Sequence, residues 1–141
     1  MTAHVLRPGP VHLLRLATGD DLYREITRYV MASDIRAATL NALGAVSRAS
    51  LRYYDQSAKR YEDLIIDEPL EVVAAVGNVS LLDGAPFVHL HAAFSAEDGR
   101  GFGGHVNDGT IVFALEVHIT QLVGEPPVRL PDDCTGLNLW G

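Results

Sequence analysis

Three histidines in the second half of the chain have the residue type and spacing of a metal site. His89 and His91 are separated by one residue in the stretch FVHLHAAFS, and His105 follows a glycine-rich turn. Successive side chains of a β-strand point to opposite faces, so His89 and His91 are expected on one face. Three neutral imidazoles with an open fourth position are the ligand pattern of catalytic zinc, although imidazole also suits other transition metals. The sequence therefore predicts a site for a divalent transition metal, with zinc as the expected ion.

The turn between the two histidine-bearing segments decides whether the third histidine meets the other two. If the hairpin is centred on Asp98, His91 lies directly opposite His105. Directly opposed side chains have Cβ atoms about 4.5–5.5 Å apart, and imidazole nitrogens bind zinc at about 2.0–2.1 Å. The loop Gly99–Gly104 would then form the rim of the site. Histidines on a solvated face would show the same alternation without any metal, so that alternative stays open.

Two carboxylates are further candidates for the chemistry of this site. Glu116 shares a face of the last expected strand with His118 and Thr120, and the opposite face is apolar, with Phe113, Leu115, Val117 and Ile119. If the polar face lines the same cavity, Glu116 is a fourth ligand or the catalytic general acid or base. The alternative is a solvated or intersubunit carboxylate, and the same choice applies to Glu71.

Composition limits the kind of protein that carries these residues. The chain has 141 residues, 48% hydrophobic and 21% charged, which is typical of one globular domain. Its net charge of −7 argues against nucleic acid as a partner, because binding to phosphates depends on basic residues. Cys134 is the only cysteine, and no apolar stretch is long enough to span a bilayer. We expect a soluble cytoplasmic protein that forms a single domain over residues 1–141 and has no membrane partner.

The expected elements are one helix and a series of strands. Asp20 or Asp21 caps a helix with an apolar stripe at Leu22, Ile26 and Val30. Strands are expected over residues 11–17, 35–46, 49–55, 60–66, 70–79, 87–95, around 105, and over 110–122. Short connections favour antiparallel pairing, so the predicted class is α+β, with about seven mostly antiparallel strands and one main helix. The core spans about 11–122, and the proline-containing tail 123–141 is expected to lie extended on the domain. One helix leaves a face or an edge of this sheet open, which favours a homo-oligomer.

The ordered motifs RLATGDDL, IRAATLNALGAVSRASLRYYD, EVVAAVGNVS, HLHAAFS, GGHV and ALEVHIT resemble the PPC (plants and prokaryotes conserved) domain. The resemblance covers roughly residues 13–122 and implies an antiparallel sheet with one main helix, assembled as a homotrimer. In plants this domain follows AT-hook motifs, and those proteins bind AT-rich DNA and regulate transcription. The present chain has no R-G-R-P hook, in agreement with its acidic charge.

The expected fold is also similar to that of acetolactate decarboxylase, a zinc enzyme whose metal is held by an H-x-H pair and one later histidine. His89, His91 and His105 match that pattern residue by residue. The leading hypothesis is a stand-alone PPC protein whose three histidines hold zinc and that binds or transforms a small oxygen-bearing molecule. If it is an enzyme, a metal-dependent lyase or hydrolase is expected. The alternative is a DNA-associated regulatory or protein-binding trimer without catalysis.

Overall fold

The computed structural model describes residues 1–141 and contains one helix and nine strands. In chain order these are β1 (Arg7–Leu16), α1 (Leu22–Ala32), β2 (Ala38–Asp55), β3 (Arg60–Ile66), β4 (Leu70–Leu82), β5 (Ala85–Ser95), β6 (Gly101–Val106), β7 (Ile111–Val123), β8 (Arg129–Asp132) and β9 (Leu137–Trp140). The helix is neither long nor apolar enough to cross a membrane. The predicted α+β class is confirmed.

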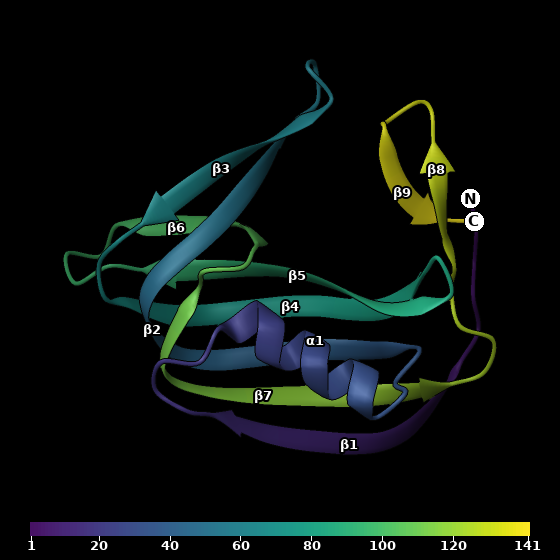
Figure 1. The fold of residues 1–141 in the computed structure, drawn as a ribbon, viewed down its shortest axis with the longest axis horizontal. Coiled ribbons are helices and arrows are strands. Elements are labelled where there is room, and N and C mark those ends of the chain that lie inside the picture. Colours follow the sequence, from purple (N-terminus) through teal and green to yellow (C-terminus); the bar gives the residue numbers. More distant parts are fainter.

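Seven strands form one antiparallel sheet in the order β1-β7-β2-β4-β5-β6, and β3 pairs with the far end of β2 (Figure 1). β2 also pairs briefly with β6, through Leu51 with Val106 and Arg52 with His105. This second pairing curls the sheet, because the end of β2 must cross from β4 to β6. The β2–β3 hairpin therefore rises away from the rest of the sheet (Figure 1).

The helix covers one face of the sheet, as its apolar stripe predicts. Asp21 is the N-cap and accepts a hydrogen bond from the backbone N–H of Arg24. Leu22, Ile26 and Val30 are fully buried against the inward residues of the strands. The opposite face of the sheet carries no helix and is called the open face below (Figure 1).

β2 differs from the two strands that were expected on either side of Gly44. The chain continues as one strand of 18 residues, and its pairing shifts register near Gly44 and near Val46 instead of ending there. Gly44 has a φ of +141°, and a Cβ built there would lie 2.2 Å from the carbonyl oxygen of Ala114. Glycine therefore allows β2 and β7 to approach closely at this point.

Phe113 does not belong to the buried face of β7, contrary to the expected alternation. Ala45 pairs with Ala114 and the next residue, Val46, pairs with Val112, so Phe113 is the extra residue of a β-bulge. The bulge turns its ring outward, where it is 61% exposed. Leu115, Val117 and Ile119 are buried, as predicted.

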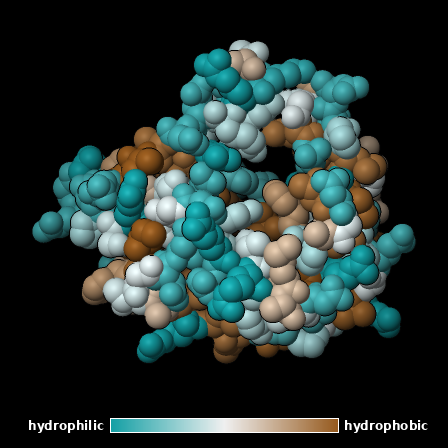
Figure 2. Space-filling view, in the orientation of Figure 1, coloured by the Kyte–Doolittle hydropathy of each residue, from teal (hydrophilic) through white to brown (hydrophobic).

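The tail after β7 contains structure that the sequence did not reveal. β8 and β9 pair with each other as a small hairpin, while Leu81 forms an isolated parallel bridge with Val128. The hairpin lies beside the β2–β3 hairpin (Figure 1), and the Tyr54 hydroxyl donates a hydrogen bond to the carbonyl oxygen of Thr135 at 2.7 Å. The space-filling view shows a hollow at this position (Figure 2). The two hairpins therefore form opposite walls above the edge of β5.

Candidate metal centre

The three predicted histidines meet on the open face of the sheet. His91 on β5 pairs directly with His105 on β6, the register expected for a hairpin centred on Asp98. His89 lies two residues from His91 on the same face, while Val88, Leu90 and Ala92 between and beside them are buried. Leu90 and its neighbours thus anchor β5 in the core and turn the imidazoles outward.

The imidazole rings are close enough to bind one ion together. One potential ligand nitrogen from each ring lies within 4.8 Å of the other two. The Nε2 atoms of His89 and His91 are 3.2 Å apart, and the ring centroids of His89 and His105 are 5.1 Å apart. Nδ1 of His105 is buried and has no hydrogen-bond partner. Three imidazole nitrogens at these distances therefore suit a divalent transition metal. The chain supplies no other partner for Nδ1 of His105.

Burial keeps these imidazoles neutral. The pKa of His89 is lowered to about 4, first by desolvation and then by the charge of Arg129 and by the other two histidines. The pKa of His105 is also lowered to about 4, by desolvation and by His91, Arg52 and Arg129. Desolvation lowers the pKa of His91 as well. Neutral imidazoles keep a free lone pair at pH 7, which metal binding requires.

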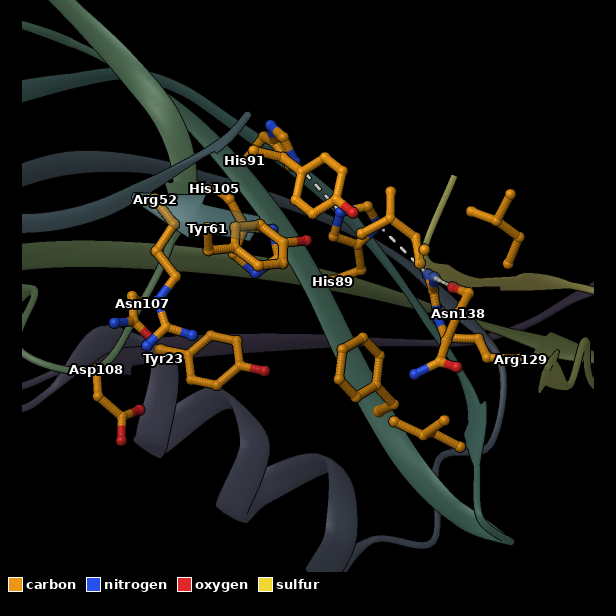
Figure 3. Close-up of a pocket in the computed structure, with 16 residues that line it drawn as sticks. Tyr23, Arg52, Tyr61, His89, His91, His105, Asn107, Asp108, Arg129 and Asn138 are labelled. Carbon is orange, nitrogen blue, oxygen red and sulfur yellow. Dashed lines mark hydrogen bonds between the residues drawn. The ribbon is translucent and has the colours of Figure 1, made fainter. Parts of the chain in front are cut away.

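A cavity of about 700 Å³ opens beside the three histidines. Arg52, Tyr54 and Tyr61 of the β2–β3 hairpin form one wall, and Leu137, Asn138 and Leu139 of the β8–β9 hairpin form the other. Tyr23, Phe87, Asn107, Asp108 and Arg129 complete the polar and aromatic lining (Figure 3). The site is thus open to a small molecule rather than enclosed, as expected for a ligand-receiving centre.

Two aromatic hydroxyls differ in their availability to a ligand. Tyr23 donates a hydrogen bond to the carbonyl oxygen of Val88, and burial together with Asp108 raises its pKa, so it remains a phenol. The Tyr61 hydroxyl forms no hydrogen bond within the chain, and its ring lies 5.6 Å from that of His105. Figure 3 shows Tyr61 in front of the histidine cluster. Tyr61 therefore brings to the cavity lining a hydroxyl that has no partner within the chain.

Other predicted residues lie away from this cavity. Glu116 is on the open face but on β7, separated from β5 by β2 and β4, and it does not line the cavity. His118 lies on the same strand, and Glu71 lines a different cavity together with Phe113. The Gly99–Gly104 loop, expected at the rim, is also absent from the lining, and its residues from Gly101 onward belong to β6.

The sequence did not reveal three residues of the cavity. Arg52 and Tyr61 come from the β2–β3 hairpin, and Arg129 comes from the tail, about 40 residues after His89. The only signal for the first two was the alternation of polar and aromatic residues along strands that are exposed. Nothing in the tail indicated that Arg129 would be buried beside His89.

The chain is a small α+β domain, an antiparallel sheet with one helix and a three-histidine cluster on its open face. A family model, the Plants and Prokaryotes Conserved (PCC) domain, matches residues 4–123, and the chain belongs to this family. The identification expected from the motif order is confirmed.

Several solved structures share the fold. A metal-containing protein from Archaeoglobus fulgidus is 42% identical, with a TM-score of 0.94 and 99% of each chain covered. A plant- and prokaryote-conserved protein from Pyrococcus horikoshii is 32% identical, with a TM-score of 0.92 over 100% of this chain and 97% of that chain. α-Acetolactate decarboxylase from Bacillus subtilis, at 20% identity and a TM-score of 0.58 over 93% of this chain and 59% of its own, shares the fold alone.

Curated relatives place the same domain in larger proteins. Two bifunctional GlmU proteins from Synechococcus are 35% and 33% identical to this chain, over 89% and 92% of its length. The chain spans only about a fifth of these relatives, 19% and 20%. A candidate DNA-binding protein from Bacteroides thetaiotaomicron, 19% identical with a TM-score of 0.87 over 98% of each chain, has the same fold.

Proposed function

We propose that the chain is a metal-binding domain in which His89, His91 and His105 hold one divalent transition metal, most simply zinc. The observation that carries the proposal is the convergence of three neutral imidazoles, with one nitrogen of each within 4.8 Å of the others. The orphaned Nδ1 of His105 supports it, because a buried polar atom without a partner is costly. The Archaeoglobus fulgidus relative, described as metal-containing, supports it further.

The cavity beside the histidines would receive a small oxygen-bearing molecule. Three protein ligands leave a coordination position open, and Tyr61, whose hydroxyl has no partner within the chain, lines the same cavity. A bound metal would supply Lewis-acid polarisation of a ligand oxygen. The chain itself would orient the ligand between the two hairpins and donate hydrogen bonds from Tyr61 and the arginines. If the site is catalytic, a lyase or hydrolase reaction suits a Lewis-acid metal beside these hydrogen-bond donors. Glu116 would then take part only from a neighbouring subunit.

We also propose that the domain assembles as a homotrimer through the open face. Large apolar side chains lie exposed on strands of that face, namely Leu13, Leu43, Val73, Val76 and Phe113. Val76 pairs directly with His91, so the apolar surface reaches the histidine cluster. An exposed apolar area of this kind usually marks a protein interface. Residence in the cytoplasm remains an expectation from the single cysteine.

Cobalt titration tests the metal proposal directly. Metal-free protein should take up one Co²⁺ per chain with the visible absorption bands of a tetrahedral site, and zinc should displace it. His91→Ala should remove these bands, while His118→Ala, on the same face but on β7, should keep them. Equal cobalt binding by wild type and His91→Ala would refute the site.

A DNA-associated regulatory role is the second candidate, supported by the DNA-binding description of the Bacteroides neighbour. DNA binding through phosphates would weaken steeply with salt. Against it stands the net charge of −7. We expect no binding to an AT-rich duplex at low salt in a gel-shift assay. Salt-sensitive binding that survives loss of the metal would favour this regulatory role.

A further inference from the structure

Arg129 is a buried cation at the wall of the cavity. It is the first residue of β8 and only 9% exposed. Its Nε donates to the Ser80 hydroxyl at 2.8 Å, and its Nη1 donates to the carbonyl oxygen of Asn138 at 3.0 Å. Its Nη2 points to Oδ1 of Asn78 at 3.1 Å and to Nδ1 of His89 at 3.3 Å. Its guanidinium also stacks over the ring of Phe87, 5.0 Å from the centroid.

None of these partners is an anion. The ion pairs of the chain involve Arg24, Arg28, Arg48, Arg52, Arg60 and Arg100 but not Arg129. The nearest carboxylate in sequence, Asp132, accepts hydrogen bonds from Thr135 instead. Burying a charge without a counter-ion is unfavourable, so proteins usually pair such groups. The missing counter-charge is therefore expected to come from outside the chain.

The rest of the cavity does not supply that charge. The only carboxylate in the lining is Asp108, which forms an ion pair with Arg24 at 3.1 Å. Arg52, the other arginine of the lining, already pairs with Asp63 at 2.9 Å. The three histidines are neutral, and a divalent metal held by them keeps its full double charge. The cavity is thus positive although the whole chain carries a net charge of −7.

One N–H of Arg129 has no acceptor within the chain, and a second loses its acceptor once metal is bound. A guanidinium has five N–H donors, and the four contacts above leave one on Nη1. The Nε2 atoms of His89 and His91 face each other, so a metal shared by the cluster would bond to Nε2 of His89. A neutral His89 bound in this way carries its proton on Nδ1 and cannot accept from Arg129. The Nη2 donor then faces a second donor, Nδ1–H of His89, at 3.3 Å, and an anion that accepts from both would relieve this contact.

We infer that the ligand of this centre is a small organic anion, with a carboxylate or phosphate group on Arg129 and a neighbouring oxygen at the metal. The inference rests on the proposed metal site and adds the chemical class of its ligand. One imidazole ring, that of His89, separates the guanidinium from the metal position. The anionic group and the metal-binding oxygen therefore belong to adjacent parts of a small molecule. Planar guanidinium recognises both carboxylate and phosphate through paired hydrogen bonds.

A purely structural Arg129 is the competing explanation, since it links β8 to β4 and β9 through Ser80 and Asn138. The two roles differ in the effect of removing the guanidinium. If Arg129 is structural, the metal alone sets the preference for an anion, and Arg129→Met leaves that preference unchanged. If Arg129 binds the anion, Arg129→Met weakens the preference.

Calorimetric titration of zinc-loaded wild-type protein with glycolate, inorganic phosphate and ethylene glycol tests whether the ligand is an anion. Glycolate and ethylene glycol match in size and hydroxyl oxygen, and only glycolate carries a carboxylate. We expect glycolate or phosphate to bind at least about tenfold more tightly than ethylene glycol, the effect of one charge-assisted hydrogen bond. The stronger of the two anions identifies the carboxylate or phosphate class. Equal affinity for all three probes, or no binding of either anion, would overturn the inference.

Substitutions of Arg129 test whether this residue causes the preference for anions. Arg129→Met should weaken the preferred anion about tenfold or more at unchanged metal content, whereas Arg52→Met, which removes an arginine already paired with Asp63, should weaken it less. Arg129→Lys keeps the charge and should retain part of the affinity, so it decides the matter if Arg129→Met does not fold. Anion affinity unchanged in Arg129→Lys and Arg129→Met would refute the assignment. Protein that holds no zinc but still prefers anions would refute the metal site and leave the anion site standing.

Discussion

His91 faces His105 across the β5–β6 ladder, with ring centroids 5.3 Å apart and ring planes nearly perpendicular. This pairing exists only if the turn between the strands has its present length, because a shift of one residue would turn every side chain of β6 to the other face. The backbone N–H of Ala96 donates to the carbonyl oxygen of Arg100, which closes this turn. The turn thereby sets the geometry of the candidate metal centre.

Insertion of one glycine after Asp98 should therefore abolish metal binding while the rest of the sheet persists. The insertion would place His105 out of register with His91, whereas β5 stays held by β4. Metal content and far-ultraviolet circular dichroism would be compared with those of wild type. A glycine inserted after Glu125, in the connection between β7 and β8, is the control for loop lengthening, because it shifts no hairpin register within the sheet. Full metal content in the first variant would show that the His91–His105 register is not needed.

Gly77 on β4 controls the approach of β4 to β5 behind His89. A Cβ at this position would lie 2.3 Å from the carbonyl oxygen of His89 and 3.0 Å from Cδ1 of Leu90. Gly77→Ala should lower the free energy of unfolding by about 1–3 kcal/mol, as overpacking does, and should weaken metal binding by displacing His89. Urea denaturation and cobalt titration measure the two effects. Gly101→Ala, whose Cβ would meet only the Phe94 carbonyl oxygen at 3.9 Å, should leave both close to wild type.

The pH dependence of metal-free protein follows from the lowered pKa values of His89 and His105. Both have a pKa of about 4 in the folded chain, against an ordinary value of 6.5. Between pH 6.5 and 4 the unfolded chain therefore binds more protons than the folded chain, so the free energy of unfolding falls as the pH is lowered through this window. Above pH 6.5 these two residues add no further change.

Urea denaturation at several pH values between 7 and 4 measures this slope, and NMR of the ring protons reports each histidine. We expect a shallower slope in His89→Gln/His105→Gln than in wild type. Ring protons of His89 and His105 that titrate near pH 6.5 in the metal-free protein would contradict the buried, neutral state. Bound metal competes with these protons, so metal affinity should also fall as the pH is lowered.

If the open face is the trimer interface, a charged side chain introduced there should lower the mass of the assembly in solution. Leu43 is 55% exposed on β2 and pairs with Glu116 on β7, so Leu43→Lys should fold but should resist burial between subunits. Light scattering after size exclusion should give a mass near 15.3 kDa for this variant and three times that value for wild type. Met31→Lys, on an exposed position of the helix, should remain trimeric. A monomeric wild type would contradict the trimer.

The sequence predicted those features that depend on short-range pattern. The alternation of side chains along a strand placed His89 and His91 on one face, and the helical spacing of Leu22, Ile26 and Val30 identified the buried stripe. The register of a hairpin centred on Asp98 placed His91 opposite His105. Glu116 shares the predicted open face, but strand order could not be read from alternation, and three steps of the sheet order separate β7 from β5.

Features that depend on tertiary contact were not predictable in this way. The continuity of β2 requires bulges that only the partner strands β4 and β7 define, and the same bulge turned Phe113 outward. Arg129 lies beside His89 because the tail folds back as a hairpin, a long-range arrangement without a local sequence signal. The sequence therefore predicted the three histidines of the cavity but not the two hairpins that form its walls.

The most direct test of the account is the metal content per chain of untagged protein purified without chelator, measured by elemental analysis. His89→Ala/His91→Ala serves as the control, and Leu90, which anchors the strand between them, stays in place. We expect about one zinc or other transition metal per wild-type chain and none in the double variant. Wild-type protein that contains no metal, and takes up none when zinc is added, would contradict it.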